Sequence, residues 1–128
     1  MIELPATFLD GAKALLGPKG WSMEADALKQ AASPWRGTWP GETPFLAMPG
    51  STDEAASLVR LCAQHRIAMV PQGGNTGLVG GQIPMGEVLL TTRRLRAIRD
   101  VSPLDDALTV EAGVTLYEGQ QAALAVDR

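Results

Sequence analysis

The sequence predicts an α+β fold in which a small, partly parallel sheet is flanked by helices and followed by a β-hairpin and one more helix. Two observations support this fold class. Short apolar runs of strand length occur along the chain between longer segments with the period of an amphipathic helix, and turn-forming residues separate them. The chain has 128 residues, of which 45% are apolar. This size and composition suit one folded domain or a part of one.

The first half of the chain predicts two helices and an irregular loop. Apolar residues recur at helical spacing from Phe8 to Leu16, and Gly17-Pro18 ends this run. A weaker helix is expected from Ser22 to about Ala32. Residues 33–50 are rich in proline and glycine and predict a loop that ends in a short strand at about 45–48. Because this loop carries two tryptophans, we expect it to be ordered and packed on the body.

The clearest helix follows this loop. Ser51 and Glu54 have capping-box spacing, and the apolar face of the helix would contain Ala55, Leu58, Val59 and Cys62. Short buried strands are expected at 68–70 and 88–90. Residues 108–112 alternate between apolar and polar types, which predicts a half-buried strand.

A turn and a last helix complete the expected elements. Residues 103–106, Pro-Leu-Asp-Asp, have turn-forming character and precede the strand at 108–112. Thr115 and Glu118 repeat the capping-box spacing and predict a helix through Leu124.

Composition argues against several classes of function. The net charge of −3 leaves no basic surplus for a general nucleic-acid binder. One cysteine cannot form an internal disulfide, which favours a reducing, cytoplasmic setting. No stretch approaches the ~20 apolar residues of a membrane helix, and the N-terminus lacks a signal-peptide pattern. A single histidine argues against a histidine-rich metal site within this chain.

The residues with the clearest chemistry are five glycines within nine positions: Gly73, Gly74, Gly77, Gly80 and Gly81. Glycine accepts positive φ angles and lets a ligand approach the backbone closely. Successive N–H groups in such a turn can converge on a phosphate, and Asn75 and Thr76 add side-chain donors. No lysine or arginine lies between Arg66 and Arg93. The loop is therefore expected to bind a diphosphate without a cationic side chain.

Two better-known phosphate loops do not fit. A Walker-type loop needs a lysine followed by serine or threonine, and no lysine follows these glycines. The dinucleotide fingerprint G-x-G-x-x-G opens a helix, whereas no window here has that spacing and residues 83–86 lead to a strand. A glycine-rich connection shaped only by packing is the structural alternative.

The string from Pro71 to Gly81, Pro-Gln-Gly-Gly-Asn-Thr-Gly-Leu-Val-Gly-Gly, resembles the pyrophosphate loop of FAD-linked oxidases of the vanillyl-alcohol oxidase type. It looks most similar to the branch of D-2-hydroxyglutarate and D-lactate dehydrogenases. Four further segments carry the resemblance: 35–37, 49–54, 59–62 and 108–114. It spans roughly residues 33–126 and is most specific around the loop.

This resemblance implies the first lobe of a PCMH-type FAD-binding domain, in which two α+β lobes clasp the cofactor. Residues 1–32 would be an N-terminal helical extension and residues 33–128 the N-terminal portion of that domain. The implied reaction is flavin-dependent oxidation of a D-2-hydroxy acid to the 2-oxo acid, with electrons passed to an acceptor that the sequence does not identify. The second lobe, the substrate domain, the catalytic base and any metal ligands would lie beyond Arg128. The chain alone would then be inactive.

The resemblance also implies which residues line the pyrophosphate of FAD: Gln72, Gly73, Gly74, Asn75, Thr76, Gly77 and Leu78. In covalent flavoprotein relatives a histidine occupies the position of Asn75. Asparagine cannot form that bond, so the resemblance implies that FAD is bound non-covalently.

Two titratable side chains have ordinary structural interpretations. Cys62 could be a reactive thiol, but its place on an apolar helix face favours a buried packing residue. His65 could be a catalytic base, yet it falls near a helix C-terminus and has no carboxylate or nucleophile at a telling spacing. A surface position that suits the helix dipole is the preferred interpretation.

The remaining candidates are basic and aromatic. A run of arginines is expected to form a solvated face, or one packed on further parts of the protein, rather than a phosphate site: Arg93, Arg94, Arg96 and Arg99. Trp35 and Trp39 could stack on a ligand, but buried anchors of the loop are preferred. Arg36 between them could contact a carboxylate.

Two rival functions remain open at this point. One is a stand-alone module that binds a nucleotide or phosphate on the loop. The other is a non-catalytic interaction fragment with no ligand. A flavin spectrum of the purified protein distinguishes the dehydrogenase hypothesis from both.

Overall fold

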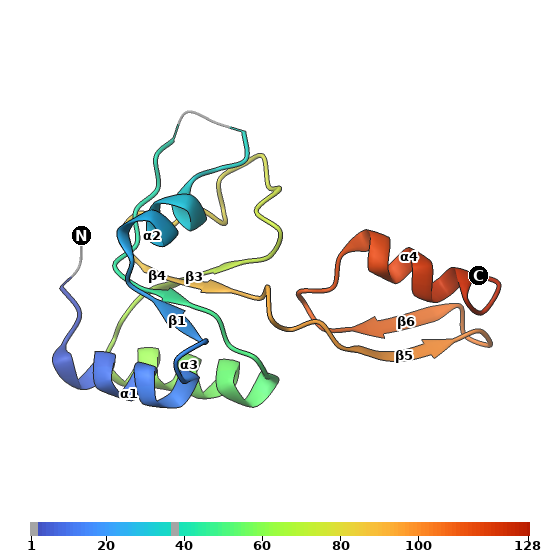
Figure 1. Ribbon diagram of the computed structural model, residues 1–128, viewed down its shortest axis with the longest axis horizontal. Helices are drawn as coiled ribbons and strands as arrows, with labels where there is room; N and C mark the ends of the chain where they lie inside the picture. The colour runs from blue at the N-terminus through green and yellow to red at the C-terminus, as the bar shows by residue number, and fades with distance from the viewer. Residues whose placement is uncertain (1–2, 37–38) are drawn as a thin grey trace.

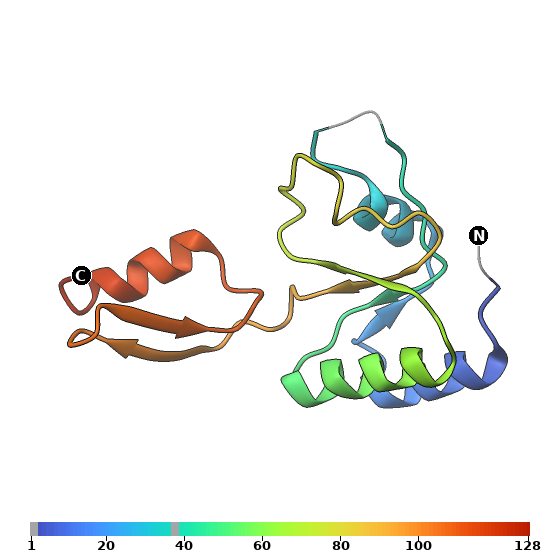
Figure 2. The ribbon, with the colours of Figure 1, turned by 180° about the vertical axis from the view of Figure 1, so that it is seen from behind.

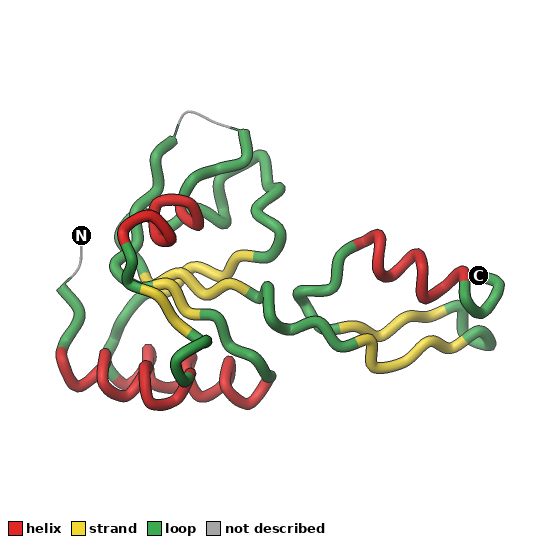
Figure 3. Tube along the Cα trace, viewed as in Figure 1, coloured by secondary structure: helices red, strands yellow, loops and turns green. Residues whose placement is uncertain are grey.

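A four-stranded sheet covered by helices, with a separate β-hairpin beside it, forms the framework of the computed structural model, which describes residues 3–36 and 39–128 (Figure 1). The hairpin and its helix, residues 98–124, extend from one side of the sheet body (Figure 3). This arrangement confirms the predicted α+β class with a small, partly parallel sheet.

The sheet contains β1 (Trp21–Ser22), β2 (Leu46–Ala47), β4 (Val88–Thr91) and β3 (Met69–Gln72), in that spatial order. β1 is antiparallel to β2, whereas β2, β4 and β3 run parallel. In the β3–β4 pair, Gln72 lies opposite Thr91. The carboxyl ends of these two strands therefore meet at one edge of the sheet.

Helices cover both faces of the sheet (Figure 2). α1 (Ala6–Leu16) and α3 (Thr52–Gln64) pack together on one face, and α2 (Ala25–Ala32) lies on the other. Side chains of a strand alternate between faces. Phe45 and Ala47 accordingly join the core under α1 and α3, while Leu46 between them faces α2. Burial on both sides explains why β2 and the first three residues of β4 are all apolar.

The larger core lies between the sheet and the pair α1 and α3. Its buried members are Phe8, Ala12, Leu16, Phe45, Ala47, Leu58, Cys62, Val88 and Leu90. α1 ends where predicted, at Gly17, whose φ of 67° lies in the left-handed region. α3 begins after Ser51, whose hydroxyl accepts from the N–H of Glu54 at 3.1 Å. The predicted start of this helix is confirmed.

The hairpin comprises β5 (Ile98–Ser102) and β6 (Ala107–Val110), and α4 (Leu116–Leu124) packs on it. The turn between the strands falls at the predicted residues 103–106. α4 begins with a complete capping box between Thr115 and Glu118, as the spacing predicts.

A side-chain hydrogen bond from Arg99 links the hairpin to the sheet body. Arg99 donates to the hydroxyl of Thr52 and to the carboxylate of Glu111, both at 2.9 Å. The Ala97 N–H and then Arg99 hold the pKa of Glu111 below its usual range. The outer surface of this unit is apolar at several positions: Leu104, Leu116, Tyr117 and Leu124 are each more than 60% exposed.

Three expectations about local structure are corrected. The weak helix expected from Ser22 begins at Ala25, because Trp21–Ser22 pairs with β2 as a strand. Val59, which was expected on the apolar face of α3, is 48% exposed. Leu61 of the same helix packs against the larger core instead.

The third correction concerns the tryptophans. Trp35 and Trp39 are 65% and 47% exposed, so they do not anchor the loop as predicted. Residues 43–47 provide its buried part instead. The Arg36 guanidinium lies over the ring of Trp35, 4.6 Å from its centroid. Gly37, one residue of the resembling segment 35–37, lies outside the described residues.

Within the described residues, no helix combines the length and apolar character that crossing a membrane requires. Residues 3–36 and 39–128 likewise contain no group of three or more histidine, cysteine, aspartate or glutamate side chains placed to hold a metal ion.

Candidate functional site

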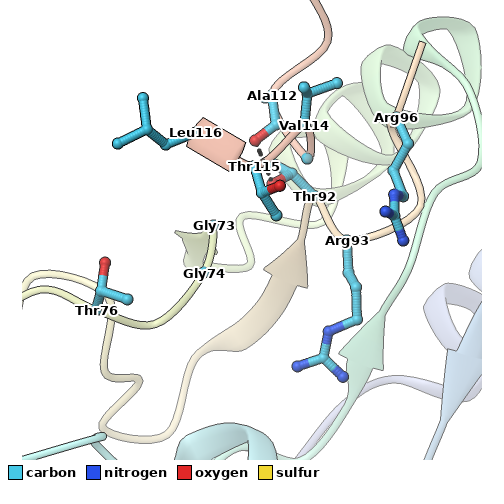
Figure 4. Close-up of a pocket in the computed structure, with 11 residues that line it drawn as sticks. Gly73, Gly74, Thr76, Thr92, Arg93, Arg96, Ala112, Val114, Thr115 and Leu116 are labelled. Carbon is cyan, nitrogen blue, oxygen red and sulfur yellow. Dashed lines mark hydrogen bonds between the residues drawn. The ribbon is translucent and has the colours of Figure 1, made fainter. Parts of the chain in front are cut away.

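A cavity of about 480 Å³ opens at the edge of the sheet where β3 and β4 end. Three segments line it (Figure 4): the glycine loop after β3 (Gly73, Gly74 and Thr76), the end of β4 (Thr92, Arg93 and Arg96), and the turn into α4 (residues 112–116). The carboxyl edge of parallel strands is where ligands bind in open α/β sheets. The first two segments reach this edge because β3 and β4 are parallel neighbours.

Gly73 and Gly74 leave room for a ligand beside the backbone. A Cβ added at Gly73 would meet its nearest neighbouring atom, the Thr92 hydroxyl oxygen, at 4.0 Å. At Gly74 the nearest atom would be Cγ2 of Thr76 at 3.8 Å. The fold itself thus has space for a methyl group at both positions. The absence of side chains here leaves the backbone open to the cavity.

The backbone donors of this loop are unused within the described chain. The N–H groups of residues 74–78 donate to no acceptor among residues 3–36 and 39–128. The expected positive φ occurs at Asn75, with φ 57°, and at Gly80, with φ 79°, but not at Gly73, Gly74 or Gly77. Asparagine tolerates the left-handed region better than most residues.

Gln72 is used inside the fold. Its side chain is 2% exposed, and its Nε2 donates to the carbonyls of Ala31 at 3.0 Å and Gln82 at 3.1 Å. These bonds attach the start of the glycine loop to α2 and to Gln82 at the end of the loop. Gln72 does not line the cavity, and its carbonyl accepts from the N–H of Thr92 at 2.9 Å, so its place in the fold is a structural one.

Asn75 likewise positions the loop. Its Nδ2 donates to the carbonyl of Ser33 at 2.7 Å, and its Oδ1 accepts from Nε2 of Gln82 at 3.3 Å. Gln82 also donates to the carbonyl of Gly77 at 2.9 Å. Sequence reasoning missed Gln82. The only signal in the sequence was a polar residue at the end of the glycine-rich string. That signal does not indicate that its side chain forms a brace, a pair of hydrogen bonds that connects the end of the loop to its middle.

The other predicted site residues take different positions. Thr76 lines the cavity with Gly73 and Gly74. Gly77 is packed closely against Gln82: a Cβ added at Gly77 would lie 2.5 Å from the Gln82 Oε1. Leu78 is 64% exposed and does not line the cavity.

The wall opposite the loop is held by two contacts between the end of β4 and the turn into α4. The hydroxyl of Thr92 donates to the carbonyl of Ala112 at 3.0 Å, and the N–H of Gly113 donates to the carbonyl of Leu95 at 2.7 Å. A Cβ at Gly113 would lie 2.1 Å from the carbonyl oxygen of Thr92. Only glycine permits this close approach.

The N-terminus of α4 also faces the cavity through Thr115 and Leu116. Glu118 accepts from the Thr115 N–H at 2.8 Å and pairs with Arg96. The hydrogen bond from Thr115, followed by the one from Arg96, lowers the pKa of Glu118 to about 2. This carboxylate is thus committed to the helix cap.

Cys62 and His65 lie away from the cavity. Cys62 is 1% exposed, as predicted, and burial raises the pKa of its thiol to about 11. His65 forms the C-cap of α3. It therefore lies near the beginning of β3, whereas the cavity lies at the end of that strand. It is half-buried rather than on the surface as predicted, because its ring packs edge-on against Phe8 with centroids 5.8 Å apart.

These residues fit a diphosphate of a nucleotide cofactor. The cavity is within the ~300–1,000 Å³ range of ligand pockets. It combines side-chain-free backbone, unused amides and two arginines, of which Arg96 is paired with Glu118, and no aspartate or glutamate among the described residues lines it. That donor set suits an anion.

Comparison with known proteins identifies the family. The sequence profile of the FAD binding domain matches residues 43–125, and the chain belongs to this family. The probable mitochondrial D-2-hydroxyglutarate dehydrogenase of Oryza sativa subsp. indica is 37% identical over 105 residues, or 81% of this chain and 19% of the relative. The D-2-hydroxyglutarate dehydrogenase of Xanthomonas citri pv. viticola is 38% identical over 90 residues, or 70% of this chain and 19% of the relative. The chain thus spans 19% of the length of these relatives.

Solved structures agree on the fold. p-Cresol methylhydroxylase with substrate bound superposes with a TM-score of 0.82 at 19% identity, covering 94% of this chain and 24% of that protein. At this identity the likeness concerns the fold alone, which is that of a PCMH-type FAD-binding domain. The predicted family, fold class and cofactor, FAD, are confirmed.

Proposed function

We propose that the chain forms the pyrophosphate-binding lobe of a flavin-dependent dehydrogenase that oxidises a D-2-hydroxy acid, such as D-2-hydroxyglutarate or D-lactate, to the 2-oxo acid. The observation that carries this proposal is the open backbone of Gly73 and Gly74 at the cavity edge. The names of the rice and Xanthomonas relatives support the substrate class. The remaining lobe, the substrate domain, the catalytic groups and the site of the electron acceptor are assigned to other parts of the protein.

In this proposal residues 72–78 bind the pyrophosphate of FAD mainly through the backbone. Gly73 and Gly74 allow close approach, and the hydroxyl of Thr76 adds a donor from the same side of the cavity. Gln72 and Asn75 hold the loop in shape. When bound, FAD supplies the two-electron acceptor for oxidation of the alcohol carbon. The described residues bind and orient the cofactor.

We further propose that FAD is held without a covalent bond. Both polar atoms of the Asn75 amide are engaged by Ser33 and Gln82, which supports a positioning role for this side chain. Acid denaturation of the full-length protein should therefore release all its flavin into solution. Flavin that stays with the precipitated protein would contradict non-covalent binding.

The substrate class is tested by anaerobic reduction of the full-length protein. D-2-Hydroxyglutarate or D-lactate should bleach the visible flavin absorbance, and the L enantiomer of each serves as the matched control. A flavoprotein that neither D acid reduces would contradict the proposed reaction. A full-length protein that binds a nucleotide but no flavin would favour the stand-alone binding module, and one that binds neither would favour an interaction fragment.

Domain limits and location are part of the same proposal. We assign residues 33–128 to the FAD-binding portion and residues 1–32 to a helical extension. The family match, which begins at residue 43, supports an extension that precedes the FAD-binding portion. α1 of this extension packs into the same core as the sheet, so the extension is part of one folded body. A cytoplasmic location is proposed from the single cysteine, Cys62, which is unpaired and buried. The rice relative is named as mitochondrial, so fractionation of cells that express the tagged protein is the appropriate test.

A further inference from the structure

Arg93 leaves the sheet beside the glycine loop. Gln72 and Thr91 are opposite each other in the β3–β4 pair, and the N–H of Thr92 donates to the carbonyl of Gln72 at 2.9 Å. Two residues beyond this pair, Gly74 and Arg93 therefore follow the ends of the two parallel strands at the same edge of the sheet. Both line the cavity, and Figure 4 shows Arg93 across from the two glycines.

The other arginines of the run at 93–99 have partners. Arg94 donates to the carbonyl of Met48 at 2.8 Å, Arg96 pairs with Glu118, and Arg99 pairs with Glu111. Arg94 thus links the end of β4 to the segment after β2, Arg96 holds the start of α4, and Arg99 holds the hairpin. They are committed to the fold.

Arg93 differs from these three. Its guanidinium has no hydrogen-bond or ion-pair partner among residues 3–36 and 39–128, and no carboxylate lines the cavity beside it. In Figure 4 the guanidinium is well separated from that of Arg96. A cation without a counter-charge thus stands beside a loop whose amides are unused.

We propose that Arg93 binds the pyrophosphate held by the glycine loop and supplies the positive charge that the loop lacks. This assignment rests on the proposed function. Hydrogen bonds from a guanidinium to phosphate oxygens are charge-assisted and can be bidentate, which neutral amides cannot match. The sequence interpretation of the arginine run as a face without phosphate contacts would then be wrong for Arg93 alone.

The test uses the full-length protein stripped of flavin. Wild type, Arg93→Gln and Arg93→Lys are titrated with FAD, with ADP, which keeps the diphosphate, and with riboflavin, which has no phosphate. Arg60→Gln on the exposed side of α3 is the matched control for loss of one arginine. Thermal unfolding verifies that each variant is folded.

Arg93→Gln should raise the Kd of FAD and of ADP about tenfold, the lower end of the range for charge-assisted hydrogen bonds, because the side chain is exposed. Arg93→Lys should recover part of the loss. Riboflavin binding and Arg60→Gln should be unaffected. The defect should shrink at high salt, where charges are screened.

Two outcomes overturn the assignment while leaving the proposed function intact. One is an unchanged FAD Kd in folded Arg93→Gln. The other is an equal weakening of FAD and riboflavin, which would place the effect away from the phosphates. A wild-type protein that binds no FAD would overturn the proposed function itself, and this assignment with it.

Discussion

Gln82 donates from its Nε2 to Oδ1 of Asn75 at 3.3 Å, and this bond closes the glycine loop on itself. The same nitrogen donates to the carbonyl of Gly77 at 2.9 Å. The loop thus has a brace that connects its middle to its end. A ligand bound by the loop amides depends on this brace, because an unbraced loop must be ordered at the moment of binding.

Gln82→Ala should therefore weaken FAD binding without unfolding the protein. Loss of two side-chain hydrogen bonds predicts a free-energy cost of about 1–2 kcal/mol, or roughly five- to thirtyfold in Kd. The measurement is a flavin fluorescence titration of the full-length apoprotein. Gln64→Ala, at the exposed end of α3, is the control. An unchanged Kd for Gln82→Ala would show that the brace is dispensable.

Gly113→Ala should destabilise the attachment of the hairpin. Its Cβ would lie 2.1 Å from the Thr92 carbonyl oxygen and 2.6 Å from that of Leu95, so backbone must move. Overpacking of this kind typically costs about 1–3 kcal/mol, and sometimes more. Thermal unfolding should show a lower Tm than for Gly81→Ala, where the added Cβ meets no atom within 4 Å. Equal Tm values for the two variants would contradict the packing described here.

The cap of α4 should depend on pH through Glu118. Its folded-state pKa is lowered to about 2, below its usual range, so the carboxylate stabilises the folded state above its unfolded pKa. That contribution is lost as the pH falls toward 2. Glu118→Gln should lower the Tm at pH 7, and the gap from wild type should close in acid. A gap that is the same at pH 3 as at pH 7 would show that the charge of Glu118 is not responsible.

The 128-residue chain alone should bind FAD poorly. The proposed function assigns the rest of the FAD site to a second lobe, so the chain alone would leave much of the cofactor in water. Tight small-ligand sites bury about 70–90% of the ligand surface. Binding must also offset an association cost of at least ~4 kcal/mol. The exposed apolar side chains Leu116, Tyr117 and Leu124 favour self-association of the isolated chain. Saturable binding of FAD at micromolar concentration would contradict this expectation.

Local patterns predicted the elements that depend on local chemistry. The spacing of Ser51 with Glu54, and of Thr115 with Glu118, located the starts of α3 and α4 because a cap is decided within four residues. β5 was anticipated only as part of a hairpin, because most of its residues are polar and exposed. A strand of that kind is defined by its partner rather than by its own pattern.

The candidate site was predictable in part. The glycine string located the loop, yet the contacts that hold Gln72 and Asn75 inside the fold come from Ala31 and Ser33, about forty residues earlier. The approach of Arg93 depends on the register between β3 and β4. Neither kind of long-range relationship is visible in the spacing of residues along one chain.

The most direct test of the glycine loop as the FAD site is the flavin content of full-length Gly74→Val. Within the described chain a Cβ at Gly74 meets nothing closer than 3.8 Å, so the variant should fold. The branched side chain would occupy the space beside the backbone that the pyrophosphate needs. Gly81→Val, where a Cβ is in open space, is the matched control and should keep one flavin per protein. Gly74→Val is expected to purify folded and without FAD. Normal flavin stoichiometry in a folded Gly74→Val protein would contradict it.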